Sequence, residues 1–135
     1  MDAFLNPVRH FSEDGAALAA YAMRTTRIRV GTGVVPIYTR TPATMAQTAA
    51  TIDDLSGGRL NLGLGVSHRP IVEGWHGQTI DRPVPEMREY VGIVRAILRG
   101  EDAPQDAEKW RTGLRNASIR GSYPDPARYF HTSRR

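Results

Sequence analysis

The chain has 135 residues, 40% of them hydrophobic and none of them cysteine, with a formal net charge of +4. This length suits one domain with its own core, and the lack of cysteine excludes disulfides and thiolate metal sites, as is usual in the cytoplasm. We therefore expect one cytoplasmic domain without a secretory leader or an apolar segment long enough to span a membrane.

The first predicted element is a helix that begins after Ser12, whose hydroxyl can accept a hydrogen bond from the first helical turn. Small or apolar side chains follow at Ala16, Leu18, Ala19, Ala20 and Met23. We expect this helix to end before a strand that starts near Arg27.

Two short strands with a helix between them come next. Residues alternate as in a buried strand at Ile28, Val30, Thr32 and Val34, and again at Leu60, Leu62 and Leu64. Roughly two dozen residues separate the strands, which suits a parallel, right-handed crossover. The sequence therefore predicts a βαβ unit.

The helix of this unit has clear ends. Thr41 can cap it and Pro42 can occupy its first position, where no N–H is needed. The Gly57-Gly58 pair can end it by adopting positive φ. Its buried face should carry Met45, Ala49 and Ile52.

A second amphipathic helix is predicted over residues 85–99 and should end at Gly100. Its apolar stripe contains Met87, Val91, Val94 and Leu98, with Tyr90 and Ile97 beside it. The segment from Pro70 to Pro85 is expected to be a loop. Its Glu73 and His76 lack a further histidine at metal-ligand spacing, so no metal site is predicted.

The chain changes character after residue 108. Residues 109–135 contain seven basic residues and one acidic residue, so they carry +6 and residues 1–108 carry −2 of the net +4. We predict a domain over 1–108 and a basic tail over 109–135 that is disordered or results from a shifted coding frame. A nucleic-acid-binding arm is an alternative, since Tyr123, Tyr129 and Phe130 could stack on bases, but the arginines show no helical or strand period.

Glycines gather where the two predicted strands end. Parallel strands bring Gly31, Gly33, Gly63 and Gly65 to one edge of the sheet, and in α/β proteins ligands bind at this edge. Glycine would let a flat or phosphorylated ligand approach the backbone. The alternative is that these glycines only permit turns or close packing.

Other glycine motifs do not fit. Pro36 and His68 stand where a dinucleotide fingerprint needs its third glycine, and no Gly-Lys-Ser or Gly-Lys-Thr of a P-loop is present. Arg69 stands where a nucleophile elbow around Ser67 needs glycine. The sequence therefore gives little support to Ser67 as a nucleophile.

Two longer patterns carry a family resemblance. Residues 25–36 read T-x-R-I-R-V-G-T-G-V-V-P, and residues 40–65 read R-x-P-A-x-x-A-Q-x-A-A-T-I-D-x-L-S-G-G-R-L-x-L-G-L-G. Over about residues 10 to 100 the chain resembles the bacterial luciferase-like monooxygenases, especially the branch that uses the deazaflavin coenzyme F420. The resemblance implies an α/β fold, namely a fragment of a TIM (β/α)8 barrel with about two parallel strands and three helices, since a whole barrel needs about 250 residues.

The resemblance also implies a cofactor site. Many family members carry a non-prolyl cis peptide at the position of Gly33-Val34, where it forms a bulge against the cofactor ring; an ordinary core valine is the alternative for Val34. Gly65, Val66, Ser67 and His68 match a segment that lies along the cofactor, and His68 could contact it, relay a proton or simply be solvated. The implied cofactor is coenzyme F420, with FMN as the alternative.

These features predict an oxidoreductase that transfers hydride to, or oxygenates, a small organic substrate. The family's acidic or histidine groups lie on earlier strands, so we assign no catalytic residue. We predict no nucleic-acid or membrane partner. The alternative is an inactive fragment that self-associates through exposed barrel edges.

Overall fold

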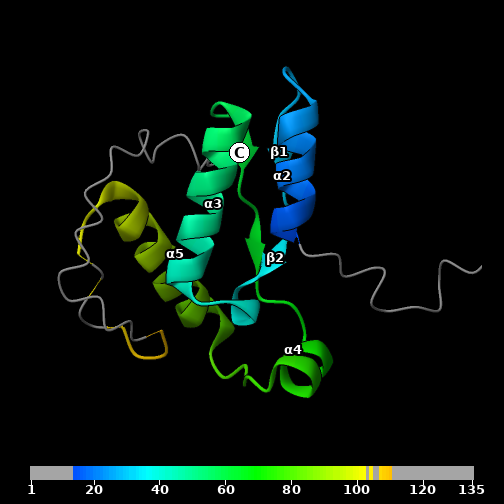
Figure 1. Ribbon diagram of the computed structural model, residues 1–135. Helices are drawn as coiled ribbons and strands as arrows, with labels where there is room; N and C mark the ends of the chain where they lie inside the picture. Colours follow the sequence, from blue (N-terminus) through cyan, green and yellow to red (C-terminus); the bar gives the residue numbers. More distant parts are fainter. Residues whose placement is uncertain (1–13, 103, 105–106, 111–135) are drawn as a thin grey trace, which may run out of the picture.

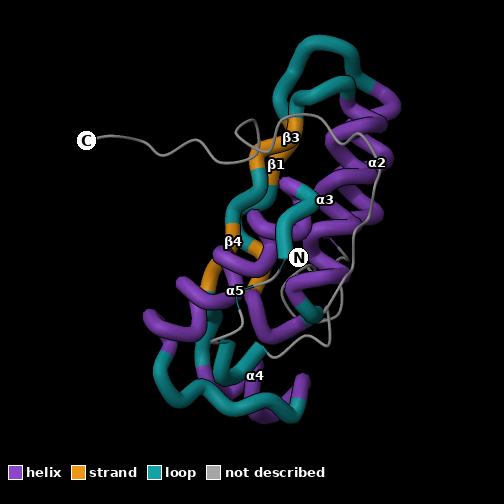
Figure 2. The backbone as a smooth tube through the Cα atoms, turned by 90° about the vertical axis from the view of Figure 1, so that its left-hand side faces the viewer, coloured by secondary structure: helices purple, strands orange, loops and turns teal. Residues whose placement is uncertain are grey.

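The computed structural model describes residues 14–102, 104 and 107–110. Within this part of the chain, short parallel strands form one layer and helices pack against one side of it (Figures 1 and 2). The predicted cap at Ser12 and the predicted tail beyond residue 110 lie outside the described residues.

Each predicted strand is divided into two short segments. The first comprises β1 (Val30–Gly31) and β2 (Val35–Pro36), and the second β3 (Leu60–Asn61) and β4 (Leu64–Gly65). β1 pairs with β3 and β2 with β4, in both cases parallel. The predicted parallel pairing is therefore confirmed, with an interruption between the two ladders.

The interruption changes which side chains are buried. Val30 and Val35 are both buried, whereas Val34 is 53% exposed, and Ile28 is exposed before β1 begins. The uniform alternation predicted from Ile28 to Val34 is therefore wrong, because the side-chain phase shifts between β1 and β2.

The helix between the strands is α3 (Pro42–Ser56), and it has the predicted caps. Thr41 accepts a hydrogen bond from the backbone N–H of Thr44 at 3.2 Å. Gly57 and Gly58 both have positive φ. The predicted inner face is buried at Met45, Ala49 and Ile52.

Helices α2 (Asp14–Arg24) and α5 (Pro83–Arg99) pack on either side of α3 (Figure 1). α2 buries Leu18 and Ala22, whereas Met23, the last of the small or apolar residues of the predicted helix, is 71% exposed. The buried side of α5 is centred on Tyr90, Ile93, Val94 and Leu98, so Met87 and Val91 lie only at its margin. Gly100 ends α5 as predicted.

The segment predicted as a loop contains the α-helix α4 (Arg69–His76), which buries Val72. It follows β4 and lies near the 3-10 helix η1 (Ile37–Thr39), which follows β2. In Figure 2, α4 therefore lies beyond the ends toward which the strands run. Within the described residues, no helix is both long and apolar enough to span a membrane.

Candidate functional site

The strand interruption consists of residues 32–34 on one strand and residues 62–63 on the other. At this place a side chain replaces main-chain pairing. The Thr32 hydroxyl donates to the carbonyl oxygen of Gly63 at 2.7 Å and accepts from the N–H of Gly63 at 2.9 Å. The Gly63 carbonyl also accepts from the N–H of Val35 at 2.9 Å. The two strands thus stay joined where the ladder is broken.

Val34 projects from this interruption over the neighbouring strand. Its Cγ1 atom lies 3.4 Å from the position that a Cβ would take at Gly63, and its Cγ2 atom lies 2.5 Å from the corresponding position at Gly65. More than half of the side chain nevertheless remains exposed. The alternative that Val34 fills the core is therefore wrong, and the Gly33-Val34 peptide bond is cis, as the family resemblance implies.

The four glycines at the strand ends differ in what a side chain would meet at each position. A Cβ at Gly31 would lie 2.7 Å from the Asn61 carbonyl oxygen, and one at Gly63 would lie 2.2 Å from the Thr32 carbonyl oxygen. At Gly65 the side chain of Val34 occupies the space, whereas a Cβ at Gly33 would meet nothing within 4 Å. Close packing between strands, the alternative left open above, therefore explains three of the four glycines.

The predicted segment Gly65–His68 connects β4 to α4. Val66 packs against the core, and Ser67 has a φ of 60°, which is uncommon for a residue with a side chain. His68 is the N-cap residue of α4, and its carbonyl oxygen accepts the N–H groups of Ile71 and Val72. Its imidazole is exposed. The structure thus brings Val34 to Gly65, while their part in binding a cofactor stays a prediction.

A buried polar cluster supports the same end of the strand layer. The Tyr38 hydroxyl in η1 donates to the Glu86 carboxylate in α5, which also accepts from the Arg82 N–H at 3.1 Å. The Lys109 ammonium lies 3.4 Å from Glu86 and 5.2 Å from the centre of the Tyr38 ring. Sequence patterns did not reveal this cluster, because its members are far apart in the chain.

The cluster shifts two pKa values in opposite directions. Burial raises the pKa of Tyr38, and its hydrogen bond to Glu86 raises it further. Burial alone would raise the pKa of Glu86, but the hydrogen bonds from Tyr38 and Arg82 and the charge of Lys109 outweigh it, so this pKa is lowered. The cluster therefore holds an ionised Glu86 beside a neutral Tyr38 near neutral pH.

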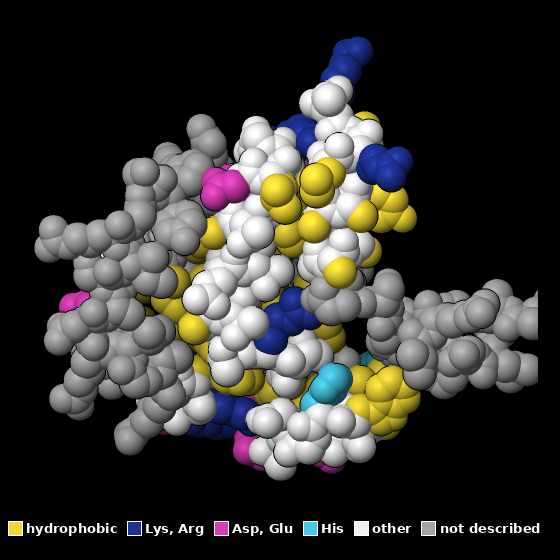
Figure 3. Space-filling view, in the orientation of Figure 1, with side chains coloured by type: hydrophobic (Ala, Val, Ile, Leu, Met, Phe, Trp, Pro, Cys, Tyr) yellow, Lys and Arg dark blue, Asp and Glu magenta, His cyan; other side chains and the backbone are white. Residues whose placement is uncertain are grey.

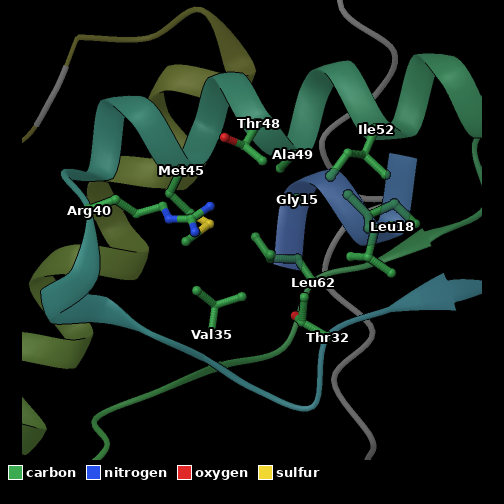
Figure 4. Close-up of a pocket in the computed structure, with 11 residues that line it drawn as sticks. Gly15, Leu18, Thr32, Val35, Arg40, Met45, Thr48, Ala49, Ile52 and Leu62 are labelled. Atoms are coloured by element: carbon green, nitrogen blue, oxygen red, sulfur yellow. The ribbon is translucent and has the colours of Figure 1, made fainter. Parts of the chain in front are cut away.

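A small cavity lies between the strands and the helices that cover them (Figure 4). Its volume is about 10 Å³, room for about one water molecule. Met45, Ala49 and Ile52 from α3 face Val35 and Leu62 across it. This cavity on the helix-covered side is therefore too small for a cofactor. Among the described residues, no group of three acidic or histidine side chains could hold a metal ion.

Comparison with known proteins gives consistent matches. A family model described as luciferase-like monooxygenase matches residues 1–127, which extends past the boundary predicted at residue 108. A Mycobacterium tuberculosis protein, provisionally named a coenzyme F420-dependent oxidoreductase, is 49% identical over 84 residues. That alignment covers 62% of this chain and 24% of the relative.

Two solved structures have a similar fold. Monooxygenase RslO1 from Streptomyces bottropensis is 30% identical with a TM-score of 0.67, over 74% of this chain and 30% of that one. The coenzyme F420-dependent tetrahydromethanopterin reductase from Methanopyrus kandleri is 25% identical with a TM-score of 0.65, over 77% and 34% of the respective chains. This likeness confirms the predicted α/β fold as part of a TIM barrel, and the chain spans about a quarter to a third of the proteins it matches.

Proposed function

The chain belongs to the luciferase-like monooxygenase family, and we propose that it forms one wall of the cofactor site of a deazaflavin- or flavin-dependent oxidoreductase. The observation that carries this proposal is the contact between Val34 and Gly65. These residues come from two different strands and belong to the two segments for which the resemblance implies a cofactor role.

The geometry around Val34 suits a flat ring. Val34 offers an exposed apolar surface, and at neighbouring Gly33 no atom beyond the two adjoining residues lies within 4 Å of where a Cβ would be. A ring could therefore approach the backbone of residues 33–34 without displacing a side chain. Ser67 supports the proposal independently, because positive φ at a non-glycine residue is a form of strain that concentrates at functional sites.

We propose coenzyme F420 as the cofactor and FMN as the alternative. The names of the Mycobacterium tuberculosis relative and the Methanopyrus kandleri reductase both mention coenzyme F420, whereas the Streptomyces bottropensis protein is named a monooxygenase. When bound, the deazaflavin supplies two-electron hydride chemistry. The residues of this chain would support the ring at Val34 and contact it along Gly65–His68.

For the whole protein we propose a small organic substrate, a cytoplasmic location and no nucleic-acid or membrane partner.

Ser67 and exposed His68 would line the site on the α4 side. His68 offers either a polar contact or a proton relay, because neutral imidazole both donates and accepts hydrogen bonds.

Titration of the 135-residue chain with coenzyme F420, and separately with FMN, tests the proposal by the change in cofactor fluorescence. We expect saturable binding that Val34→Asp weakens at least about ten-fold, because a carboxylate would be desolvated against the ring without a hydrogen-bond partner. Val84→Asp is the matched control: Val84 is also an exposed valine, in the first turn of α5. Far-ultraviolet circular dichroism checks that both variants are folded.

Each outcome of this titration has a definite meaning. Tighter binding of FMN than of coenzyme F420 would make FMN the cofactor of this site. Equal cofactor affinity of Val34→Asp and Val84→Asp would show that Val34 does not belong to the cofactor site. A folded chain that binds neither cofactor would overturn the proposal.

Self-association without catalysis is the second candidate function. Each described ladder has only two strands, so in this part of the chain every strand has one edge that pairs with no other strand. Tyr21 and Met23 of α2 and Leu55 of α3 are exposed, and Figure 3 shows hydrophobic side chains over these two helices. Concentration-dependent assembly in sedimentation velocity, without binding of either cofactor, would favour a homo-oligomer formed through the open strand edges.

A further inference from the structure

The Thr32 hydroxyl is placed where the strand pairing fails. The N–H of Thr32 still bonds to the Asn61 carbonyl oxygen at 3.2 Å, and the next main-chain bond runs from Val35 to Gly63 at 2.9 Å. Between these two bonds, the Thr32 side chain binds both polar groups of Gly63. The Gly63 N–H donates to the Thr32 hydroxyl oxygen, and the Gly63 carbonyl oxygen accepts from that hydroxyl. One side chain thus takes the place of a missing main-chain partner.

This arrangement determines where Val34 can lie. With Gly63 held by Thr32, residues 33 and 34 need not pair with it and can leave the strand layer. Val34 then rests on the two glycines of the other strand, close to both Gly63 and Gly65. A Cβ at Gly63 would lie 2.2 Å from the Thr32 carbonyl oxygen, so a side chain at this position would force the two strands apart.

We propose that Thr32 is a positioning residue, whose hydroxyl holds the strand interruption in the shape that presents Val34 to the cofactor. The inference rests on the proposed function. Thr32 itself lines the small cavity on the helix-covered side (Figure 4), so it acts through Gly63 and Val34 and not by touching the ring. Loss of the hydroxyl would leave the half-buried Gly63 N–H without its acceptor, while the Gly63 carbonyl oxygen would keep the bond from the Val35 N–H.

Three variants of the full chain separate this role from general stability. Thr32→Val keeps the branched shape and removes the hydroxyl, whereas Thr32→Ser keeps the hydroxyl and should restore the wild-type behaviour. Thr51→Val is the matched control, because the Thr51 hydroxyl also bonds to a backbone carbonyl, that of Gln47 at 2.9 Å, but on the exposed side of α3.

The first readout needs no cofactor. Amide hydrogen exchange followed by NMR should speed up at least about ten-fold at Gly63 in Thr32→Val, because its N–H loses its acceptor. The amide of Gly58, which bonds to the Asp53 carbonyl at 2.9 Å, serves as the internal reference and should be unchanged. Thr32→Ser and Thr51→Val should stay within about two-fold of the wild type at both amides.

The second readout is affinity for coenzyme F420 and for FMN, measured at a temperature where all variants are folded. We expect Thr32→Val to weaken binding at least about five-fold and Thr32→Ser to restore it. Unchanged affinity in Thr32→Val, or unchanged exchange at Gly63, would overturn the positioning role while the proposed function stands. Absence of cofactor binding by the folded wild-type chain would overturn the proposed function itself and this inference with it.

Discussion

At the scale of single residues, Gly63 shows how little space separates the two strands. A Cβ there would lie 2.2 Å from the Thr32 carbonyl oxygen, which is a backbone atom and cannot swing aside. We therefore expect Gly63→Ala to lower the free energy of unfolding by about 2 kcal/mol or more, through overpacking. Urea unfolding followed by circular dichroism measures this change.

Gly74→Ala is the control for Gly63→Ala. Gly74 lies inside α4 with an unremarkable φ, and a Cβ there would meet no atom within 4 Å. The change should stabilise the chain by roughly 0.5–1 kcal/mol, since alanine loses less conformational freedom in a helix. Equal effects of the two alanines would show that the strands are farther apart at Gly63 than described.

The glycine pattern could be predicted from the sequence, but the part played by Thr32 could not. Glycines at two strand ends already indicate close backbone approach. A hydroxyl that replaces main-chain pairing depends on the register of a partner 31 residues away, and register follows from the packed structure. For the same reason the exposure of Val34 was not predicted by alternation.

At the scale of elements, Arg59 joins α2, α3 and the start of β3. Its guanidinium donates to the carbonyl oxygens of Ala22, Thr25 and Ile28, to the Thr25 hydroxyl, and to the Ser56 carbonyl oxygen. Its charge also lies at the carboxyl end of α2, where the helix dipole favours a cation. Arg59 therefore fixes how α2 meets the strand layer.

We expect Arg59→Met to destabilise the chain by about 2–4 kcal/mol, since methionine keeps much of the apolar stem but none of the five hydrogen bonds. Arg29→Met is the control, because Arg29 is exposed and makes one side-chain bond, to Asn61 at 3.1 Å. That variant should change the free energy of unfolding by no more than about 0.5 kcal/mol. Similar losses in both variants, measured by urea unfolding, would show that Arg59 does not hold the elements together.

The elements that the sequence predicts best have both a periodic face and recognisable ends. α3 has Thr41, Pro42 and Gly57 at its ends, and α5 ends at Gly100. α4 was missed because it is only eight residues long, contains Gly74, and has Val72 as its one buried residue. So short a segment leaves too few positions for a helical period to be recognised.

At the scale of the whole molecule, one polar cluster ties distant parts of the chain together. Glu86 of α5 binds Tyr38 of η1 and Lys109, and Trp110 packs edge-on against Tyr90 with ring centres 5.0 Å apart. The indole N–H of Trp110 also donates to the Glu86 carbonyl oxygen at 3.2 Å. Residues 109 and 110, which the predicted boundary assigns to the tail, thus contact the core of the described domain.

This cluster predicts how stability depends on pH. The pKa of Glu86 is lowered below its ordinary 4.5 in the folded chain, so the unfolded chain binds its proton more readily. The stabilisation is therefore present above about pH 4.5 and is lost as the pH falls through the lowered pKa. The raised pKa values of Tyr38 and Tyr90 give stabilisation that is present below pH 10 and is lost as the pH rises further.

Glu86→Gln tests how much of the loss of stability at acid pH comes from Glu86. At pH 7 it should cost about 1.5–3 kcal/mol, because the carboxylate that accepts from Tyr38 and Lys109 is replaced by a neutral amide. Between pH 5 and pH 3 its urea midpoint should fall less steeply than that of the wild type, since the group with the lowered pKa is gone. Above pH 10 the loss due to Tyr90 should remain, and the loss due to Tyr38 should become smaller, because Glu86 contributes to the raised pKa of Tyr38. If the urea midpoints of the two proteins fell equally steeply between pH 5 and pH 3, other carboxylates would cause the acid sensitivity. The contribution of the Glu86 cluster to stability would then not depend on pH in this range.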